Sequence, residues 1–214
     1  MARIEADLED LSTRARIRDA ALRHFGEHGF GGASIRGIAE AAGVSSGLVR
    51  HHFGSKLALR EACDDYLIKT VRRINDEART DTMLADVNPV AAAQAALGPY
   101  QRYLARALTE GWAAPLFDEM ARLSEEWLEE VDKARPDPPF ASRKARATVA
   151  TAMSLAVPIL HQHISRGLGV DLASPEGAHL LAMTLLDIHS HPMVTPEAAA
   201  AMREGLEKLR DKSL

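Results

Sequence analysis

The sequence predicts an all-α protein with a small three-helix head followed by a larger helical bundle. Apolar residues recur at three- and four-residue spacing along most of the 214 residues, and no segment shows the alternation of a half-buried strand. Hydrophobic residues make up 46% of the chain and aromatic residues 5%, which is typical of soluble helical proteins. The length suits a small domain plus one sizeable core, and we place the boundary between residues 1–56 and 57–214.

Two helices are expected before residue 43. Ser12 is positioned to begin the first, whose apolar residues recur at helical spacing until Gly29 ends it. Ser34 is positioned to cap the second, which runs to about Ala42. Both helices have one apolar side, so they are expected to pack together.

The segment from Gly43 to Lys56, GVSSGLVRHHFGSK, predicts a turn and a third helix. Gly43 suits the left-handed conformation that ends a helix, and Ser45 offers a hydroxyl cap to the next one. Val49 and Phe53 lie one turn apart and form the apolar back of this short helix. Its opposite side is small, cationic and rich in donors, with Ser46, Gly47, Leu48, Arg50, His51 and His52. Such a helix fits the major groove of DNA, so the three helices predict a helix-turn-helix domain.

The motif residues also resemble a known family. The pattern Ile17-x-x-Ala20-Ala21-x-x-x-Phe25-x-x-x-Gly29-Phe30, then Ser34-Ile35-x-x-Ile38-Ala39-x-x-Ala42-Gly43-Val44-Ser45-x-Gly47, then His52-Phe53-x-Ser55-Lys56, resembles the TetR family of bacterial repressors. The resemblance covers about Ser12 to Arg60, a quarter of the chain. One departure is Leu48-Val49-Arg50-His51, where the family commonly has a small or hydroxyl residue followed by two aromatics.

The resemblance implies a homodimer that binds a palindromic operator in double-stranded DNA. We expect phosphate contacts from hydroxyl, imidazole and ammonium groups, and base contacts from the front of the third helix. The candidate DNA-binding residues are Ser34, Arg36, Ser45, Ser46, Gly47, Leu48, Arg50, His51, His52 and Lys56. Of these, Ser34, His52 and Lys56 are expected at phosphates, and Arg36, Gly47, Leu48 and Arg50 at bases.

The charge distribution agrees with a DNA-binding head. The formal net charge is −4, but residues 12–60 hold eight Lys or Arg against three acidic residues. The rest of the chain is therefore acidic, and the positive charge is concentrated where phosphate attraction is useful.

Several function classes find no support in the sequence. No apolar run reaches the ~18 residues of a membrane span, and the acidic amino terminus does not resemble a secretory signal. Cys63 is the only cysteine, so no internal disulfide is expected, and we expect a cytoplasmic protein. No phosphate loop, nucleophile elbow or other catalytic constellation is present, so no enzyme activity and no cofactor are expected.

The histidines near the carboxyl terminus do not form a convincing metal site. Asp187, His189 and His191 alternate along the chain, and side chains two residues apart on a helix diverge by about 200°. We therefore expect no bound metal.

The body is predicted to contain helices over about 57–79, 88–110 and from Pro115 onward, followed by a loop at the three prolines of 135–139. Helices over 141–166 and 175–189 are apolar on more than one side. Such helices are buried on more than one side, so we expect them to form the dimer interface. A large monomeric core is the alternative.

A small-molecule pocket is implied by the family, whose members commonly release DNA when a ligand enters the body. The candidate lining residues are large and apolar or aromatic: Tyr66, Tyr100, Tyr103, Trp112, Phe117, Met120, Trp127, Met153 and Met183. Each of them also fits ordinary core packing. The sparse charge favours a small apolar effector, uncharged or weakly polar and of unknown identity, which we expect between the connecting helix and the body near Tyr66, Tyr100 or Trp112.

Two alternatives remain open. One is a DNA-binding regulator without a small-molecule effector. The other is a helical enzyme or binding protein that kept the head but lost DNA binding. Loss of Arg50, His52 or Lys56 would favour the second alternative, and all three are present.

Overall fold

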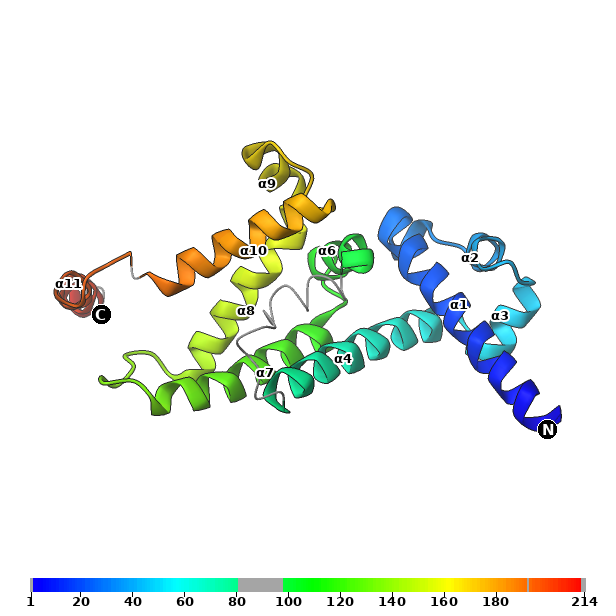
Figure 1. The fold of residues 1–214 in the computed structure, drawn as a ribbon, viewed down its shortest axis with the longest axis horizontal. Helices are drawn as coiled ribbons and strands as arrows, with labels where there is room; N and C mark the ends of the chain where they lie inside the picture. Colours follow the sequence, from blue (N-terminus) through cyan, green and yellow to red (C-terminus); the bar gives the residue numbers. More distant parts are fainter. Residues whose placement is uncertain (1, 81–97, 192, 213–214) are drawn as a thin grey trace. The chain divides into compact units, whose positions relative to one another are not determined.

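The computed structural model describes residues 2–80, 98–191 and 193–212 (Figure 1). These residues form α-helices and one short 3-10 helix, and no strand occurs among them, so the all-α prediction is confirmed. The chain divides into two compact units, residues 1–169 and 170–214, which are described separately. In the described residues no helix is both long and apolar enough to cross a membrane. The boundary at residue 56 stays a prediction.

The first helix, α1, spans Ala2–Gly32 and is interrupted at Gly29, whose φ of 70° and ψ of 171° are not helical. The predicted start at Ser12 is wrong, because the helix begins ten residues earlier. Residues 2–11 contain Ala, Glu, Leu and Arg, all of which favour a helix, and that preference outweighs the capping tendency of one serine. The predicted interruption at Gly29 is confirmed.

The next two helices are those that the sequence predicts. The helix α2 spans Ile35–Ala42 and α3 spans Ser46–Phe53. The Ser34 hydroxyl accepts a hydrogen bond from the Gly37 amide, and Gly43 ends α2 with a φ of 66°. Leu48 donates its amide proton to the Ser45 hydroxyl at 3.1 Å. Local side-chain chemistry therefore sets both boundaries of the turn.

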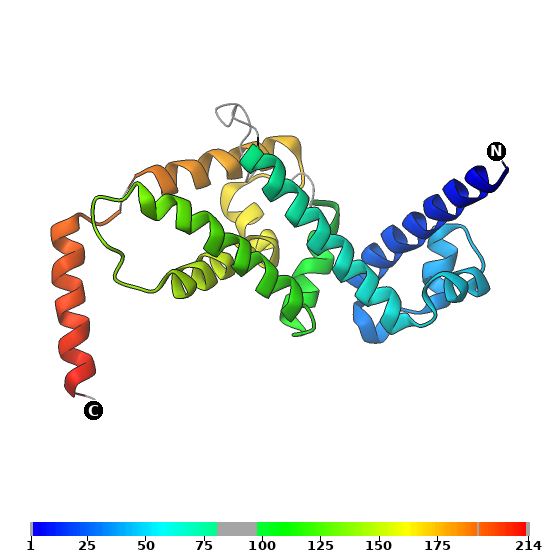
Figure 2. The ribbon, with the colours of Figure 1, turned by 90° about the horizontal axis from the view of Figure 1, so that it is seen from below.

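The helix α4, Lys56–Thr80, runs from the head into the body and packs beside α7, Ala114–Lys133 (Figures 1 and 2). The prediction of a helix over 57–79 is thereby confirmed, and so is the helix expected from Pro115. The predicted helix over 88–110 lies partly outside the described residues. Its described part consists of a 3-10 turn, η1 (Gly98–Tyr100), and α6 (Gln101–Thr109).

The single helix predicted over 141–166 is wrong. Two helices occupy this range, α8 (Arg143–Ile159) and α9 (His161–Leu168), and they meet at Leu160 with φ −97° and ψ 12°. Pro158 has no amide proton and its ring crowds the preceding turn, which weakens the helix at this point. The three-proline loop before α8 is confirmed.

The core of the first unit is continuous from the head to α6 and the start of α7. Its largest fully buried side chains are Tyr103, Phe25, Ile17, Leu22, Ile38, Leu59, Leu67, Leu116, Val49 and Cys63. Because residues of α1, α4 and α6 belong to one cluster, the head is packed onto the body as well as connected to it by α4.

The second unit contains α10 (Pro175–Ser190) and α11 (Pro196–Lys212). The predicted helix over 175–189 is confirmed, with Ser174 as its cap. Gly177 lies against the preceding turn so closely that a Cβ at this position would be 2.0 Å from the Asp171 carbonyl oxygen.

Candidate nucleic-acid interface

The α3 helix has a buried back and an exposed front. Val49 is fully buried and Phe53 is 9% exposed, and both belong to the head core. A helix of eight residues is too short to be stable alone in water, so this packing holds it in place. On the front, Arg50 and His51 are exposed, as is Gly47. The front therefore offers donors and little bulk to a groove.

The other α3 candidates lie at the edges of this front. Ser46, Leu48 and His52 are half-buried, and the rings of His51 and His52 lie 5.5 Å apart. The structure thus brings together the residues from Ser45 to His52 on one short helix. Their individual contacts with DNA stay predictions.

The start of α2 supplies two further candidates. Ser34 is exposed, and its hydroxyl accepts the Gly37 amide proton at 3.0 Å. A hydroxyl that accepts one bond keeps its own proton for donation, so capping and phosphate binding are compatible. Arg36 is exposed in the first turn of the same helix.

Lys56 is turned toward the protein. Its ammonium donates hydrogen bonds to the carbonyl oxygens of Phe30 at 2.8 Å and Ala33 at 2.9 Å, and it lies 4.6 Å from the centre of the Phe30 ring. Two of its three protons are therefore used inside the head. The predicted phosphate contact stays a prediction and can involve only the remaining proton.

Arg14 is a head residue that the sequence did not single out. Its Nη1 donates to the His52 carbonyl oxygen at 3.1 Å, and its guanidinium lies 4.7 Å from the centre of the Phe53 ring. Arg14 is exposed, and it stabilises the carboxyl end of α3, where a cation is favourable. Its partner is 38 residues away, and no local sequence signal connects the two.

The candidate pocket residues do not form one group. Four of them lie where α1, α4 and α6 meet, and we call this region the junction. Tyr66 packs edge to face with Tyr100 at 6.1 Å, and Tyr103 with Trp112 at 5.2 Å. Phe117 and Met120 are half-buried on α7. The other three are exposed: Trp127 on α7 at 60%, Met153 on α8 at 67%, and Met183 on α10 of the second unit at 53%. The ligand pocket stays a prediction.

Polar contacts hold the junction together. The Tyr103 hydroxyl donates to Asp64 Oδ1 at 2.6 Å, and the Tyr100 hydroxyl donates to Asp19 at 3.4 Å. Burial raises the pKa of Asp64, although the Tyr103 hydrogen bond and Arg60 oppose this effect. These contacts connect α6 to α4 and η1 to α1.

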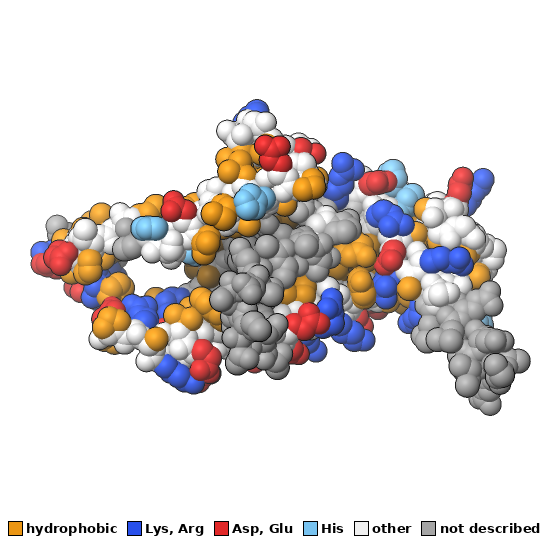
Figure 3. Space-filling view, in the orientation of Figure 1, with side chains coloured by type: hydrophobic (Ala, Val, Ile, Leu, Met, Phe, Trp, Pro, Cys, Tyr) orange, Lys and Arg blue, Asp and Glu red, His pale blue; other side chains and the backbone are white. Residues whose placement is uncertain are grey.

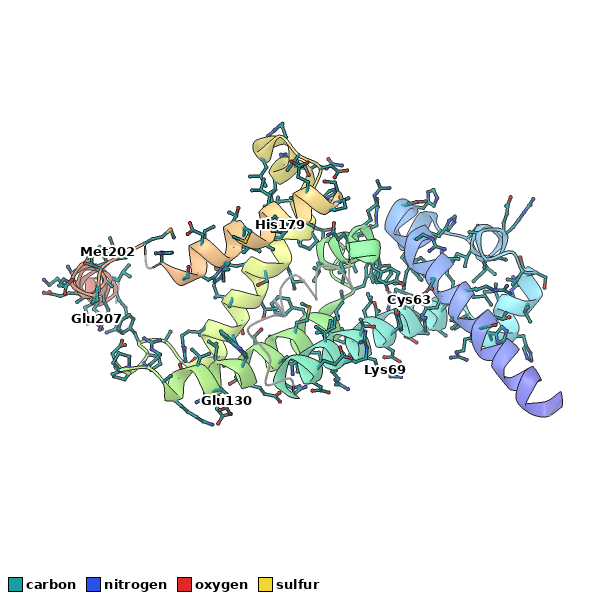
Figure 4. All side chains as sticks on the ribbon, viewed as in Figure 1. Cys63, Lys69, Glu130, His179, Met202 and Glu207 are labelled. Atoms are coloured by element: carbon teal, nitrogen blue, oxygen red, sulfur yellow. The ribbon has the colours of Figure 1, made fainter. Side chains whose placement is uncertain are left out.

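Cys63 lies on α4 beside α1, where its thiol donates to the Arg18 carbonyl oxygen at 3.8 Å (Figure 4). Burial raises the pKa of this thiol well above its ordinary value. It therefore stays protonated and is a core residue, not a nucleophile.

An ion pair joins α4 to α7 farther along the body. Glu119 has a side chain that is 10% exposed, and its Oε1 accepts from Arg72 Nε and from Arg122 Nη2, each at 2.6 Å. The hydrogen bonds from Arg72 and then Arg122 lower the pKa of Glu119 to about 2. The carboxylate is therefore ionised at neutral pH and fixes the position of α4 along α7.

The helices predicted to form the dimer interface expose apolar side chains. On α8 these include Val149 and Met153, and on α10 they include Met183, Leu186 and Ile188. Figure 3 shows hydrophobic side chains at the surface over α9 and over α10 on the face drawn. The two helices are in different units, so their pairing stays a prediction.

The histidines of the second unit are exposed. His179, labelled in Figure 4, lies on α10, and His189 Nδ1 donates to the Leu185 carbonyl oxygen at 2.6 Å. His191 lies 3.4 Å from Asp187. Among the described residues no three potential metal ligands are grouped together.

The capped helix-turn-helix, with its buried back and cationic front, has the geometry of a DNA-binding head. Residues 17–63 match the family described as "Bacterial regulatory proteins, tetR family", so the head is similar to that of TetR-family proteins. This confirms the predicted resemblance.

Two relatives extend the comparison. The regulatory protein RaaS of Mycobacterium tuberculosis is 40% identical over 147 residues, which are 64% of this chain and 66% of that protein. The repressor AcnR of Corynebacterium efficiens is 46% identical over 46 residues, 22% of this chain and 24% of that protein. The chain therefore spans just under two thirds of the first relative's length and about a quarter of the second's. Both are named as transcriptional regulators.

Solved structures share the fold. A gamma-butyrolactone receptor described as ArpA-like has a TM-score of 0.59 at 22% identity, over 71% of this chain and 81% of that chain. A structure described as the molecular basis for control of antibiotic production by bacterial hormones has a TM-score of 0.59 at 25% identity, over 82% of this chain and 96% of that chain. The helical body, and not the head alone, therefore has counterparts in known structures.

Proposed function

We propose that the chain is a homodimeric, cytoplasmic transcriptional repressor that binds a palindromic operator and releases it when a small uncharged molecule binds in the body. The observation that carries this proposal is the α3 helix, whose apolar back is buried in the head while Arg50 and His51 face outward. The names of the relatives, one of them a repressor, support regulation of transcription. The proposal requires no metal and no cofactor.

The direct test is selection of bound duplexes from a random-sequence pool, followed by measurement of Kd at several salt concentrations. We expect one palindromic sequence and a strong salt dependence, because phosphate contacts release counterions. Arg50→Ala should weaken this operator by about 1–3 kcal/mol and relax the preference at one base pair. The matched control is Arg73→Ala, which removes an exposed arginine of α4. Selection that returns no preferred sequence contradicts the proposal.

Dimerisation is tested by one charge on each proposed interface helix. Leu160 is 46% exposed in the single chain, and Leu185 is half-buried on α10. Leu160→Asp and Leu185→Asp should each split the dimer, since an unpaired charge buried in an interface costs about 3–5 kcal/mol. Sedimentation of the wild-type chain as a monomer at micromolar concentration contradicts this part of the proposal.

Ligand control has a thermodynamic signature. A ligand that releases the operator binds the DNA-free dimer more tightly, typically by about 1–3 kcal/mol, and the operator must weaken the ligand by the same factor. Titrating candidate molecules by Trp112 and Trp127 fluorescence, with and without operator, measures both affinities. Equal affinities exclude ligand-driven release for that molecule. For a regulator without a small-molecule effector, no candidate molecule should show an affinity that the operator changes.

A further inference from the structure

The kink in α1 interrupts the helical backbone conformation at Gly29. In a continuous helix the Phe30 amide would donate to the Gly26 carbonyl oxygen, four residues earlier. Gly29, at φ 70° and ψ 171°, turns the chain out of the helix before this bond can form. Carbonyl groups before the kink can therefore accept hydrogen bonds from outside the helix, at the place where α1 meets α6.

Arg106 of α6 bonds to these carbonyl groups, and Glu110 lies directly after the same helix. Arg106 Nε donates to the Gly26 carbonyl oxygen at 3.2 Å, and its Nη2 donates to that of Glu27 at 3.5 Å. Glu110 accepts from Trp112 Nε1 at 3.0 Å. Together, Trp112, Arg106 and Phe30 lower the pKa of the Glu110 carboxyl, so it stays ionised at neutral pH.

The two side chains also bond each other, and the backbones are close. Arg106 Nη1 lies 3.3 Å from Glu110 Oε1, one helical turn away. A Cβ on Gly26 would be 2.8 Å from the Tyr103 amide nitrogen, so α1 and α6 touch at this glycine. A Cβ on Gly29 would be 3.0 Å from Arg106 and 3.1 Å from Glu110. The pair thus fits a space that only glycines leave open.

We infer that Arg106 and Glu110 are positioning residues that fix the orientation of the DNA-binding head on the body, because Arg106 bonds the α1 carbonyl groups next to the Gly29 kink and Glu110 holds Arg106 in place. The pair acts through α1 and does not contact DNA. The pair determines how precisely the head is held, and it affects DNA binding only through that precision. In a dimer, this precision decides whether two heads reach successive half-sites together.

The first experiment needs no DNA. Spin labels are attached at Glu40→Cys in the head and Lys144→Cys on α8, both exposed positions, while the buried Cys63 thiol stays unreactive. Labelled chains are diluted with unlabelled protein, and the head-to-body distance distribution is measured. Arg106→Met, which keeps the apolar stem and removes the donors, should broaden the distribution. Arg106→Lys keeps a cationic donor and should restore most of the wild-type width.

Arg102→Met is the matched control. Arg102 is exposed one turn earlier on α6, and its side chain has no hydrogen bond or ion pair with the described residues. The Arg102→Met substitution removes the same charge from the same helix and should leave the width of the distance distribution unchanged. An unchanged width in Arg106→Met, or equal broadening in Arg102→Met, overturns the inference.

A second readout rests on the proposed function. Kd is measured for the selected operator and for a duplex whose half-sites are moved apart by one base pair. The ratio of the second Kd to the first measures how rigidly the two heads are held. Arg106→Met should reduce this ratio about fivefold, the size of effect that coupled neighbouring side chains carry. A variant that is only less stable lowers the active fraction for both duplexes and leaves the ratio unchanged. An unchanged ratio counts against the inference, whereas failure to select any operator counts against the proposed function alone.

Discussion

Replacing Lys56 by methionine separates two roles that its position allows. The ammonium donates to the carbonyl oxygens of Phe30 and Ala33, the last part of α1 before α2 begins. Methionine keeps the apolar stem and removes both hydrogen bonds. Hydrogen bonds from charged groups contribute about 1.5–3 kcal/mol each, and Lys56 is only half-buried, so water partly replaces the lost donors. We therefore expect a loss of about 2–4 kcal/mol in the free energy of unfolding.

The loss should appear in thermal unfolding followed by circular dichroism. For a chain of this size, it corresponds to a decrease in Tm on the order of 10 °C. Lys69→Met is the control, because Lys69 is exposed on the same helix (Figure 4), and its Tm should match that of the wild type. The salt dependence of operator binding gives the second measurement. Loss of a phosphate contact lowers the slope of log K against log salt by about 0.9 per protomer, and we expect a smaller change for Lys56→Met. A Tm within about 1 °C of wild type, together with the full slope change, would refute the internal role.

Two further substitutions test packing and charge. Gly177→Ala places a Cβ 2.0 Å from the Asp171 carbonyl oxygen, so it should destabilise the second unit by about 1–3 kcal/mol. Gly205→Ala is the control, because Gly205 lies in open space on α11, and it should stabilise its helix by up to about 1 kcal/mol. Chemical denaturation compares the two variants, and equal effects would contradict the close contact at Gly177. Because hydrogen bonds from Arg72 and Arg122 lower the folded-state pKa of Glu119 to about 2, its contribution to stability is full above the unfolded-state pKa near 4.5 and disappears as pH falls to about 2. Glu119→Gln should be less stable at pH 7 and lose less stability over that acid range, and an unchanged pH profile would show that the ion pair does not stabilise the fold.

The head could be predicted from the sequence because its boundaries depend on neighbouring residues. Ser34 and Ser45 each cap a helix through an amide three residues ahead, and Gly43 adopts the left-handed conformation that only glycine reaches without strain. Such signals lie within one turn of the features they specify. The start of α1 was mispredicted for the same reason, since Ser12 carries a capping signal that the helix-forming residues before it override.

The direction in which a long side chain turns was not predictable. Lys56 reads as a phosphate contact in the sequence, and its partners Phe30 and Ala33 lie 26 and 23 residues away. The sequence suggests that Arg106 and Glu110 form an ordinary i, i+4 pair on a helix surface, yet Arg106 bonds to α1, about 80 residues earlier. The sequence contains Pro158, but the apolar residues around it favoured one continuous helix, so the end of α8 at Ile159 was not predicted.

The carboxyl end of α1 is held by two cations from different helices, Lys56 of α4 and Arg106 of α6. Separating α4 from α6 would also break the buried bond between Tyr103 and Asp64, and an unsatisfied buried group costs about 1–3 kcal/mol, as much as a typical ligand coupling supplies. We therefore expect the head to move as one body together with α6 and the start of α4.

The chain leaves this body after α6, in the link to α7, where Gly111 has a φ of 76°. The ion pair between Arg72 and Glu119 crosses from α4 to α7, and the Arg72 side chain is 52% exposed. The ion pair and the packing between α4 and α7 oppose a shift of α4 along α7, although water can offset part of the lost contact at the exposed Arg72 guanidinium. A ligand in the body that moves α7 would change the position of α4 and with it the head, whereas the wedge expected at Tyr66, Tyr100 or Trp112 would act against the hydrogen bond and the aromatic contacts of the junction.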